Sequence, residues 1–239
     1  AELTLDDARY LVDERPLVGD YCLVSLASHV GAADRDAVVR EIASLLDGLG
    51  LPVRFLAHFG SLVPGESRGD SVMHDRVIGA MRSPASVITP TTSEEAARLA
   101  RAAALVVSSR YHPVVFAVPA GVPAIGIPVD DYTGVKLRGA LGNFGQDGVL
   151  PVEELVAGRG GAVASRVWAR REEIRENAAR LSDEKQAASA DWWDRGVRAL
   201  RDEPSIRPRA APAPAHRPAA SAGWRTARSR CCRPRRRAG

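Results

Sequence analysis

Residues 104–127 decide the fold, and they read ALVVSSRYHPVVFAVPAGVPAIGI. Two uncharged apolar runs of strand length, 104–108 and 123–127, enclose a polar turn and a segment that opens on Pro113. Short apolar runs without polar alternation are typical of strands buried on both faces of a sheet. Proline is common at the first position of a helix, so we expect a short helix over 113–120. The stretch therefore predicts a strand, a crossover helix and a second, parallel strand.

The same pattern extends upstream and downstream of this stretch. Further apolar runs of strand length lie at 21–27, 53–58 and 86–89. Strands that alternate with helices predict an α/β fold, a Rossmann-like doubly wound parallel sheet with right-handed crossovers. Helices are expected after a cap at Asp34, over 72–81, from the capping box Thr92-Ser93-Glu94-Glu95 to about Ala103, over 135–141, and as one long polar helix over about 164–194.

Composition and charge narrow the class of protein. With 239 residues, 45% hydrophobic and 26% charged, the chain has the composition of a globular protein. Its net charge of +4 arises at the C-terminal end, because 11 Arg and 2 acidic residues lie from Arg201 onward and the first 200 residues carry −5. The basic excess is therefore no argument that the folded part binds nucleic acid. No uncharged apolar run is long enough for a transmembrane helix.

We expect three segments along the chain. Residues 1–17 form an N-terminal linker segment, residues 18–200 form the folded domain, and residues 201–239 form a tail rich in Arg, Pro and Ala. The tail has too few apolar side chains to offset its ordering entropy, so we expect it to be disordered. The three cysteines form no disulfide framework, which favours the cytoplasm, with the inner face of the membrane as a second option.

Ligands of doubly wound sheets bind beyond the carboxyl ends of the strands. We therefore expect the loops that follow the strands to lie along one edge of the sheet. These loops are Ser25–Gly31, His58–Ser61, Thr89–Thr92, Ser108–His112 and Pro128–Lys136.

The turn Ser108–Pro113 carries the strongest chemical signal. Arg110 offers a planar fork suited to carboxylate or phosphate, and His112 can give or take a proton near neutral pH. Backbone amides at a helix start favour an anion. Together these groups suit chemistry on an acidic, phosphorylated substrate. The structural alternative is a strand-to-helix turn in which the arginine pairs with an acid and the histidine caps the backbone.

The run from Ala103 to Lys136 resembles the C-terminal signature of polysaccharide pyruvyl transferases. The resemblance covers about residues 18–195, and its Arg-x-His motif is shared loosely with glycosyltransferases of the same two-lobed architecture. The matching features are the apolar strand before Ser109, Arg110-x-His112, Phe116-Ala117, Gly121-Val122-Pro123, the polar turn Asp130-Asp131-Tyr132, and Lys136.

This resemblance implies the second lobe of a two-lobed, glycosyltransferase-B-like bacterial enzyme. Such enzymes transfer the pyruvyl group of phosphoenolpyruvate to a sugar of a cell-surface polysaccharide or its lipid-linked precursor, in exopolysaccharide or cell-wall biosynthesis. Phosphate leaves and a pyruvate ketal forms. Phosphoenolpyruvate is the donor substrate, and we expect no cofactor and no metal. His112 is the expected general acid, and Arg110 is expected to hold the carboxylate or the phosphate.

Four further residues are candidates for substrate binding. Ser109 belongs to the motif, and Lys136 is either a second cationic contact or a surface lysine. His29 and His58 follow the first and second strands, so each either contacts the acceptor or a nucleotide diphosphate or makes a structural contact in its loop. His74 is expected on a helix surface. No cluster of metal ligands is present in the sequence.

Three functional hypotheses remain open at this stage. The first is a polysaccharide pyruvyl transferase. Because the chain resembles only the second lobe of that family, this hypothesis requires a first lobe or a separate subunit as a partner. The chain would then be a fragment or one half of a split enzyme. The second hypothesis is a sugar-nucleotide-dependent glycosyltransferase of similar architecture. The third is a non-catalytic binding lobe.

Overall fold

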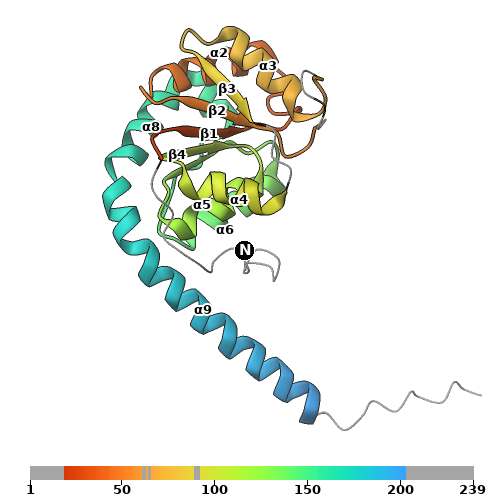
Figure 1. Ribbon diagram of the computed structural model, residues 1–239, viewed down its shortest axis with the longest axis vertical. Coiled ribbons are helices and arrows are strands. Elements are labelled where there is room, and N and C mark those ends of the chain that lie inside the picture. The colour runs from red at the N-terminus through yellow and green to blue at the C-terminus, as the bar shows by residue number, and fades with distance from the viewer. Residues whose placement is uncertain (1–18, 61–62, 64–65, 89–91, 203–239) are drawn as a thin grey trace, which may run out of the picture. The chain divides into compact units, whose positions relative to one another are not determined.

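The computed structural model describes residues 19–60, 63, 66–88 and 92–202. Five parallel strands form one sheet in the order β3-β2-β1-β4-β5 (Figure 1). Each strand overlaps an apolar run of the sequence, so the predicted α/β, doubly wound parallel sheet is confirmed. The strands are β1 (Cys22–Ser25), β2 (Val53–Leu56), β3 (Ala85–Ile88), β4 (Leu105–Ser108) and β5 (Ala124–Gly126).

Helices cover both faces of this sheet, because neighbouring strand residues point to opposite sides. Cys22 and Val24 belong to the core on one face, whereas Leu23 belongs to the core on the other. Figure 1 shows α2 and α3 on one side of the sheet and α4, α5 and α6 on the other. The first core includes α2 (Arg35–Asp47), α3 (Asp70–Ala80) and α8 (Gly160–Ala169), and the second includes α4 (Ser93–Ala102), α5 (Tyr111–Ala117) and α6 (Asp131–Gly142).

Two predicted helix caps are confirmed. Asp34 Oδ1 accepts a hydrogen bond from Ala37 N at 3.3 Å, and Thr92 Oγ1 accepts one from Glu95 N at 3.1 Å. Each side chain satisfies one of the amides that the first turn of a helix leaves without an intrahelical acceptor. The local sequence therefore fixes where α2 and α4 begin.

The start of α5 differs from the prediction. The helix begins at Tyr111 rather than at Pro113, and it continues after Ala117 as the 3₁₀ turn η1 (Val118–Ala120). Proline is tolerated at the third position, since amides of the first turn have no intrahelical partner to lose. Arg110 is the extended residue that caps the helix. The polar turn is consequently shorter than expected, and His112 lies on the helix itself.

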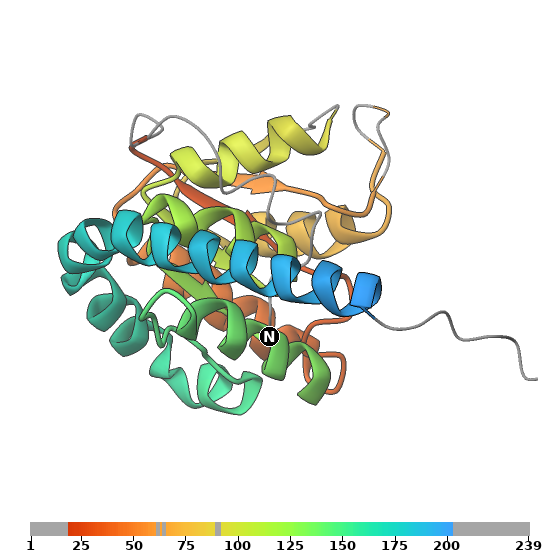
Figure 2. The ribbon, with the colours of Figure 1, turned by 90° about the horizontal axis from the view of Figure 1, so that it is seen from below.

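The long polar helix expected over 164–194 is wrong in its bounds. The structure has α8, which ends at Ala169, and α9 (Arg171–Asp202), with a break at Arg170. Helix α9 is the long cyan-to-blue helix in Figure 2. The side chains of α8 pack with α2, whereas α9 passes Gly121 so closely that a β-carbon there would lie 2.9 Å from Arg175 Cα. A single straight helix could not make both the contact with α2 and the contact with Gly121. The short helix α7 (Val152–Glu154) and the turn η2 (Leu155–Arg159) lead into α8.

Parts of the expected domain organisation fall outside the described residues. These are the linker segment 1–17, most of the tail 201–239, and the loop positions 61, 62, 64, 65 and 89–91. Among the helices of the described part, none is long and apolar enough to cross a bilayer.

Candidate active site

The candidate site lies where the order of the strands reverses, between β1 and β4. From β1 the chain crosses to β2 on one side, and from β4 it crosses to β5 on the other. Loops that diverge at such a point leave a crevice at the carboxyl edge of the sheet, where ligands of this fold bind. Ser25 and Ser108 are the paired last residues of the two strands. The turn that carries Arg110 and His112 follows Ser108 directly.

Hydroxyl groups tie the two loops at this edge together. Ser108 Oγ lies 3.0 Å from the Ser25 carbonyl oxygen and accepts a hydrogen bond from Arg110 N at 3.0 Å. Ser109 Oγ accepts a hydrogen bond from Ala27 N at 2.7 Å, and the residue is only 2% exposed. These bonds hold the backbone on which the site is built. The predicted contact of Ser109 with substrate stays a prediction.

Arg110 forms an ion pair with Asp70, the first residue of α3. Arg110 Nε donates to Asp70 Oδ2 at 3.1 Å, and Arg110 Nη2 donates to Asp70 Oδ1. The carboxylate has no exposed surface, whereas the arginine side chain is 30% exposed. This ion pair is the one expected from the structural alternative for this turn, in which the arginine pairs with an acid. Nη1 takes no part in the pair, so the guanidinium keeps one edge for a ligand.

His58 lies beside this ion pair. Its Nδ1 is 3.0 Å from Ser25 Oγ, and its Nε2 is a buried atom with no hydrogen-bond partner in the described part of the chain. Burial lowers the pKa of His58 to about 4, while the charge of Asp70 acts in the opposite direction; His112 and Arg110 lower the pKa further. His58 is therefore neutral at neutral pH, and the charges of Asp70, Arg110 and His112 all act on its pKa.

The expectation that His74 lies on a helix surface is wrong. The side chain is fully buried, and its Nε2 accepts a hydrogen bond from Leu26 N at 3.0 Å. That bond requires an unprotonated Nε2, and burial lowers the pKa of His74 to about 4. His74 thus holds the loop after β1 from the side of α3.

His112 and Lys136 approach the same turn from different helices. His112 is an exposed residue in the first turn of α5, and its ring centroid lies 5.9 Å from that of Phe116. The Lys136 ammonium of α6 lies 4.3 Å from the centre of the Tyr111 ring. A cation over an aromatic face is held there electrostatically. The fold therefore brings Lys136 next to Tyr111, and its predicted contact with substrate stays a prediction.

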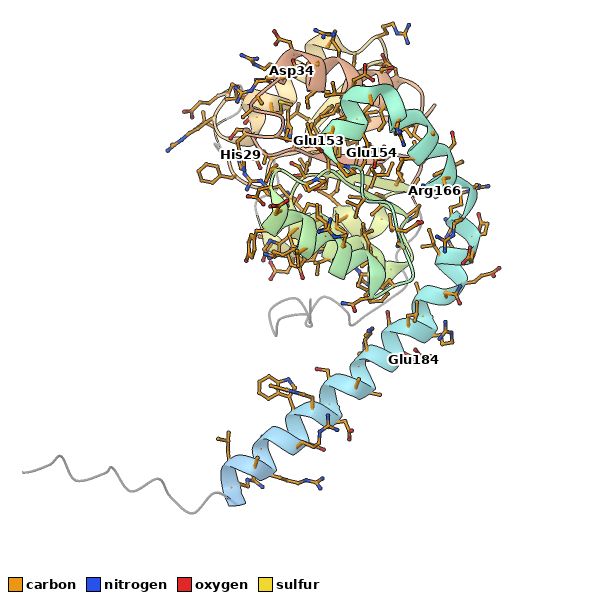
Figure 3. All side chains as sticks on the ribbon, turned by 180° about the vertical axis from the view of Figure 1, so that it is seen from behind. His29, Asp34, Glu153, Glu154, Arg166 and Glu184 are labelled. Carbon is orange, nitrogen blue, oxygen red and sulfur yellow. The ribbon has the colours of Figure 1, made fainter. Side chains whose placement is uncertain are left out.

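His29 lies apart from the ion pair. It is an exposed residue in the connection between β1 and α2, as Figure 3 shows. The pKa of Asp130 is lowered chiefly by hydrogen bonds from Thr133 and, to a smaller degree, by the charge of His29. The predicted contact of His29 with an acceptor stays a prediction.

Sequence reasoning did not single out Asp70 or Ser25. A signal for Asp70 exists in the spacing of Asp70, Met73, His74 and Val77, which places a carboxylate and an imidazole on the buried stripe of α3. A helix predicted to start at Val72 hides that signal. Gly69 permits the earlier start because it adopts a positive φ of 59°, in close contact with Phe59.

A groove of about 380 Å³ lies away from the Arg110–Asp70 ion pair, between α2 and α8, and it does not coincide with the chemistry. No histidine lines it, and Glu41 is its one carboxylate. We therefore place the candidate site by the convergence of polar groups rather than by concavity. Within residues 19–60, 63, 66–88 and 92–202, no three His, Cys, Asp or Glu side chains are grouped to hold a metal ion.

No family model matches this chain, and no curated protein matches it. Solved structures that resemble it include glycosyltransferases. They include the spinosyn rhamnosyltransferase SpnG complexed with spinosyn aglycone (16% identity, 84% of this chain, 49% of that chain, TM-score 0.48) and the calicheamicin glycosyltransferase CalG4 (15%, 83%, 51%, 0.46). Phytolacca americana UGT2 complexed with UDP-2fluoro-glucose and pterostilbene is a third (16%, 80%, 45%, 0.38).

The chain spans about half the length of these three solved chains. Likeness at this level concerns the fold alone and carries no argument about substrate. None of the three is named as a pyruvyl transferase. The choice between donor substrates therefore rests on the residues of the site.

Proposed function

We propose that this chain is the C-terminal lobe of a polysaccharide pyruvyl transferase, which uses phosphoenolpyruvate to form a pyruvate ketal on a sugar. The observation that carries the proposal is the turn after β4. It presents the exposed His112 at the carboxyl edge together with Arg110, whose guanidinium is paired with Asp70 on one side. The Lys136 ammonium lies close to the ring of Tyr111, the residue between Arg110 and His112 in the sequence. Two cationic side chains, from the turn after β4 and from α6, together with the His112 imidazole suit an acidic, phosphorylated donor.

The proposed reaction assigns His112 the role of general acid. An imidazolium at His112 would give its proton to the methylene carbon of phosphoenolpyruvate, which becomes the methyl group of the ketal. The positive charge that develops at the adjacent carbon attracts a sugar hydroxyl oxygen. A second hydroxyl then displaces the phosphate. One hydroxyl proton returns to the imidazole, and the other leaves with the phosphate, so atoms and charges balance.

Arg110 and Lys136 would bind the two anionic groups of the donor. Phosphoenolpyruvate carries a carboxylate and a phosphate, and two separated cations can hold both while the methylene carbon faces His112. The chemistry needs no redox step, so we propose phosphoenolpyruvate as the donor substrate without a separate cofactor. Acceptor-binding groups would come from a first lobe or partner subunit.

A nucleotide-sugar glycosyltransferase is the second candidate, and the names of the solved structures agree with it. In that case the same cations would bind a diphosphate, and His58 or His29 would face the nucleoside. This candidate predicts that the chain binds a nucleoside diphosphate sugar more tightly than phosphoenolpyruvate.

Parallel titrations separate the two candidates. The purified chain is titrated with phosphoenolpyruvate and with UDP-glucose by calorimetry, and both titrations are repeated with Arg110→Lys. Pyruvyl transfer predicts binding of phosphoenolpyruvate that weakens about tenfold in the variant, since an ammonium does not reproduce the planar fork. Preference for UDP-glucose would overturn the proposal in favour of the second candidate. Binding of neither would leave the lobe without the proposed donor site.

A direct assay tests the reaction itself. Phosphoenolpyruvate and a defined acceptor glycan are mixed with the chain and with whatever first lobe it pairs with. The expected products are inorganic phosphate and a ketal methyl signal in the proton NMR spectrum of the glycan. Release of phosphate without acceptor would contradict a transfer reaction.

A further inference from the structure

Only the side of the Arg110 guanidinium that does not pair with Asp70 can bind a ligand. The guanidinium has five N–H donors in a rigid plane. Asp70 engages the N–H of Nε and one N–H of Nη2, which leaves both N–H groups of Nη1 and the second N–H of Nη2 outside the pair. An anion that binds Arg110 must therefore approach from the side that carries Nη1. The side that would give the usual Nε–Nη2 fork is already occupied by protein.

Asp70 is itself held firmly, which makes the orientation of that edge a property of the fold. Its Oδ2 also accepts a hydrogen bond from Phe59 N at 3.1 Å, and its own amide donates to the Phe59 carbonyl oxygen at 2.7 Å. The carboxylate is fully buried at the start of α3. Two oxygens that each bind a fixed donor leave the carboxylate no freedom to rotate.

The ion pair has a second effect that opposes ligand binding. A buried carboxylate beside Arg110 cancels much of the positive potential that an anion would otherwise meet. If charge alone determined anion binding, the site would bind anions more tightly without Asp70. Charge and orientation therefore predict opposite outcomes for the loss of Asp70.

We propose that Asp70 is a positioning residue for the substrate anion: it fixes the Arg110 plane so that the Nη1 edge faces the position of the donor, beside His112. The inference rests on the proposed function for the identity of the donor. The gain in orientation outweighs the loss of positive potential, because a preorganised arginine gives up less side-chain entropy when the anion binds.

Asp70→Asn separates the two effects in the full chain. Asparagine keeps the shape of the side chain and removes its negative charge, but its NH₂ group meets an N–H donor of Arg110. We expect about tenfold weaker binding of phosphoenolpyruvate by calorimetry. Equal or tighter binding would overturn the proposal, since that is the outcome that charge alone predicts.

Asp47→Asn is the matched control. Asp47 is also a carboxylate with little exposed surface that is bound by an arginine and by backbone amides, but it lies at the opposite edge of the sheet. The control removes the same charge and is expected to lower stability while leaving the affinity for phosphoenolpyruvate unchanged. Equal losses of affinity in both variants would assign the effect to general destabilisation and contradict a positioning role.

A spectroscopic readout keeps the inference independent of the donor. The Nε proton of Arg110 is hydrogen-bonded to Asp70, so we expect a slowly exchanging, downfield-shifted NMR signal that disappears in Asp70→Ala, which has no side-chain acceptor, and returns in part in Asp70→Glu. Persistence of that signal in Asp70→Ala would overturn the proposal. A wild-type chain that shows the signal but binds no phosphoenolpyruvate would contradict the proposed function alone.

Discussion

Asp70 and Asp47 are two carboxylates on opposite edges of one sheet, the first fully buried and the second 8% exposed, and each accepts hydrogen bonds from an arginine and from the backbone. At the amino edge, Asp47 accepts from Ser83 Oγ at 2.6 Å, from Ser83 N at 2.9 Å and from Arg82 N at 3.0 Å. These bonds hold the pKa of Asp47 well below its usual range. At the carboxyl edge, Asp70 binds the Arg110 side chain and the Phe59 amide.

The two arginines differ more than the two carboxylates. The Arg82 side chain is 87% exposed, so Asp47 acts mainly on the backbone that leads from α3 into β3. Arg110 is mostly buried, and its charge acts on the pKa of His58. The same residue types therefore hold a loop at one edge and orient a candidate binding group at the other. The reason is topological, since loops diverge only at the carboxyl edge where the strand order reverses.

The largest expected effect is on turnover, and we expect it only from a substitution at the carboxyl edge. His112→Ala should lower the rate of ketal formation by about 10²–10⁴, the usual range for loss of a general acid. Because His112 is exposed, the free energy of unfolding should stay nearly constant. Phosphate release and urea unfolding measure the two quantities. Near wild-type turnover would remove the proposed acid.

The next largest effect contrasts the two arginines in stability. Arg110→Ala leaves the buried Asp70 carboxylate without its charged partner, and we expect a loss of about 2–4 kcal/mol in the free energy of unfolding. Arg82→Ala should change it by less than about 1 kcal/mol, because that side chain is exposed. Urea denaturation at neutral pH compares them. Similar values for both variants would erase the difference between the two edges.

Acid should destabilise the carboxyl edge through its two histidines. His58 and His74 have folded-state pKa values lowered to about 4, so between about pH 6.5 and pH 4 the unfolded chain binds more protons than the folded one. Stability should therefore fall as the pH drops through that window. His74→Gln keeps an acceptor for Leu26 N and should flatten the fall. An unchanged acid slope in this variant would contradict the assignment.

The smallest effect concerns the amino edge and a lower pH window. The lowered pKa of Asp47 contributes stability that is present above about pH 4, the unfolded value, and is lost as the pH falls through the folded value. Asp47→Asn should lower stability at neutral pH by about 1 kcal/mol, through weaker hydrogen bonds. The difference from wild type should shrink below about pH 4. A difference that stays constant with pH would show that the charge of Asp47 plays no part.

Local sequence was sufficient wherever a few neighbouring residues decide the structure. The five strands follow from short apolar runs, and the caps at Asp34 and Thr92 follow from one side-chain oxygen three residues before an amide. The Arg110–His112 turn could likewise be placed at the carboxyl edge, because it lies between a buried strand and a helix. These features depend on interactions within about ten residues of chain.

Predictions failed where distant contacts decide between local options. His74 satisfies a helical pattern equally well on a surface or in the core, and only the packing of α3 against β1 shows that it is buried. The break at Arg170 is invisible to periodicity, since both flanking segments are good helices. It arises because α8 and α9 make contacts on different parts of the domain.

The sequence by itself determined the strands of the sheet, the starts of α2 and α4 and the turn that carries Arg110 and His112. Only the tertiary structure decided what Arg110 can do. Its partner Asp70 is 40 residues earlier, on a helix that reaches the same edge through the strand order β2-β1-β4. No local pattern specifies which carboxylate meets which arginine across that distance. The pairing, and with it the edge that the guanidinium offers to an anion, follows from the packing of α3 beside the end of β4.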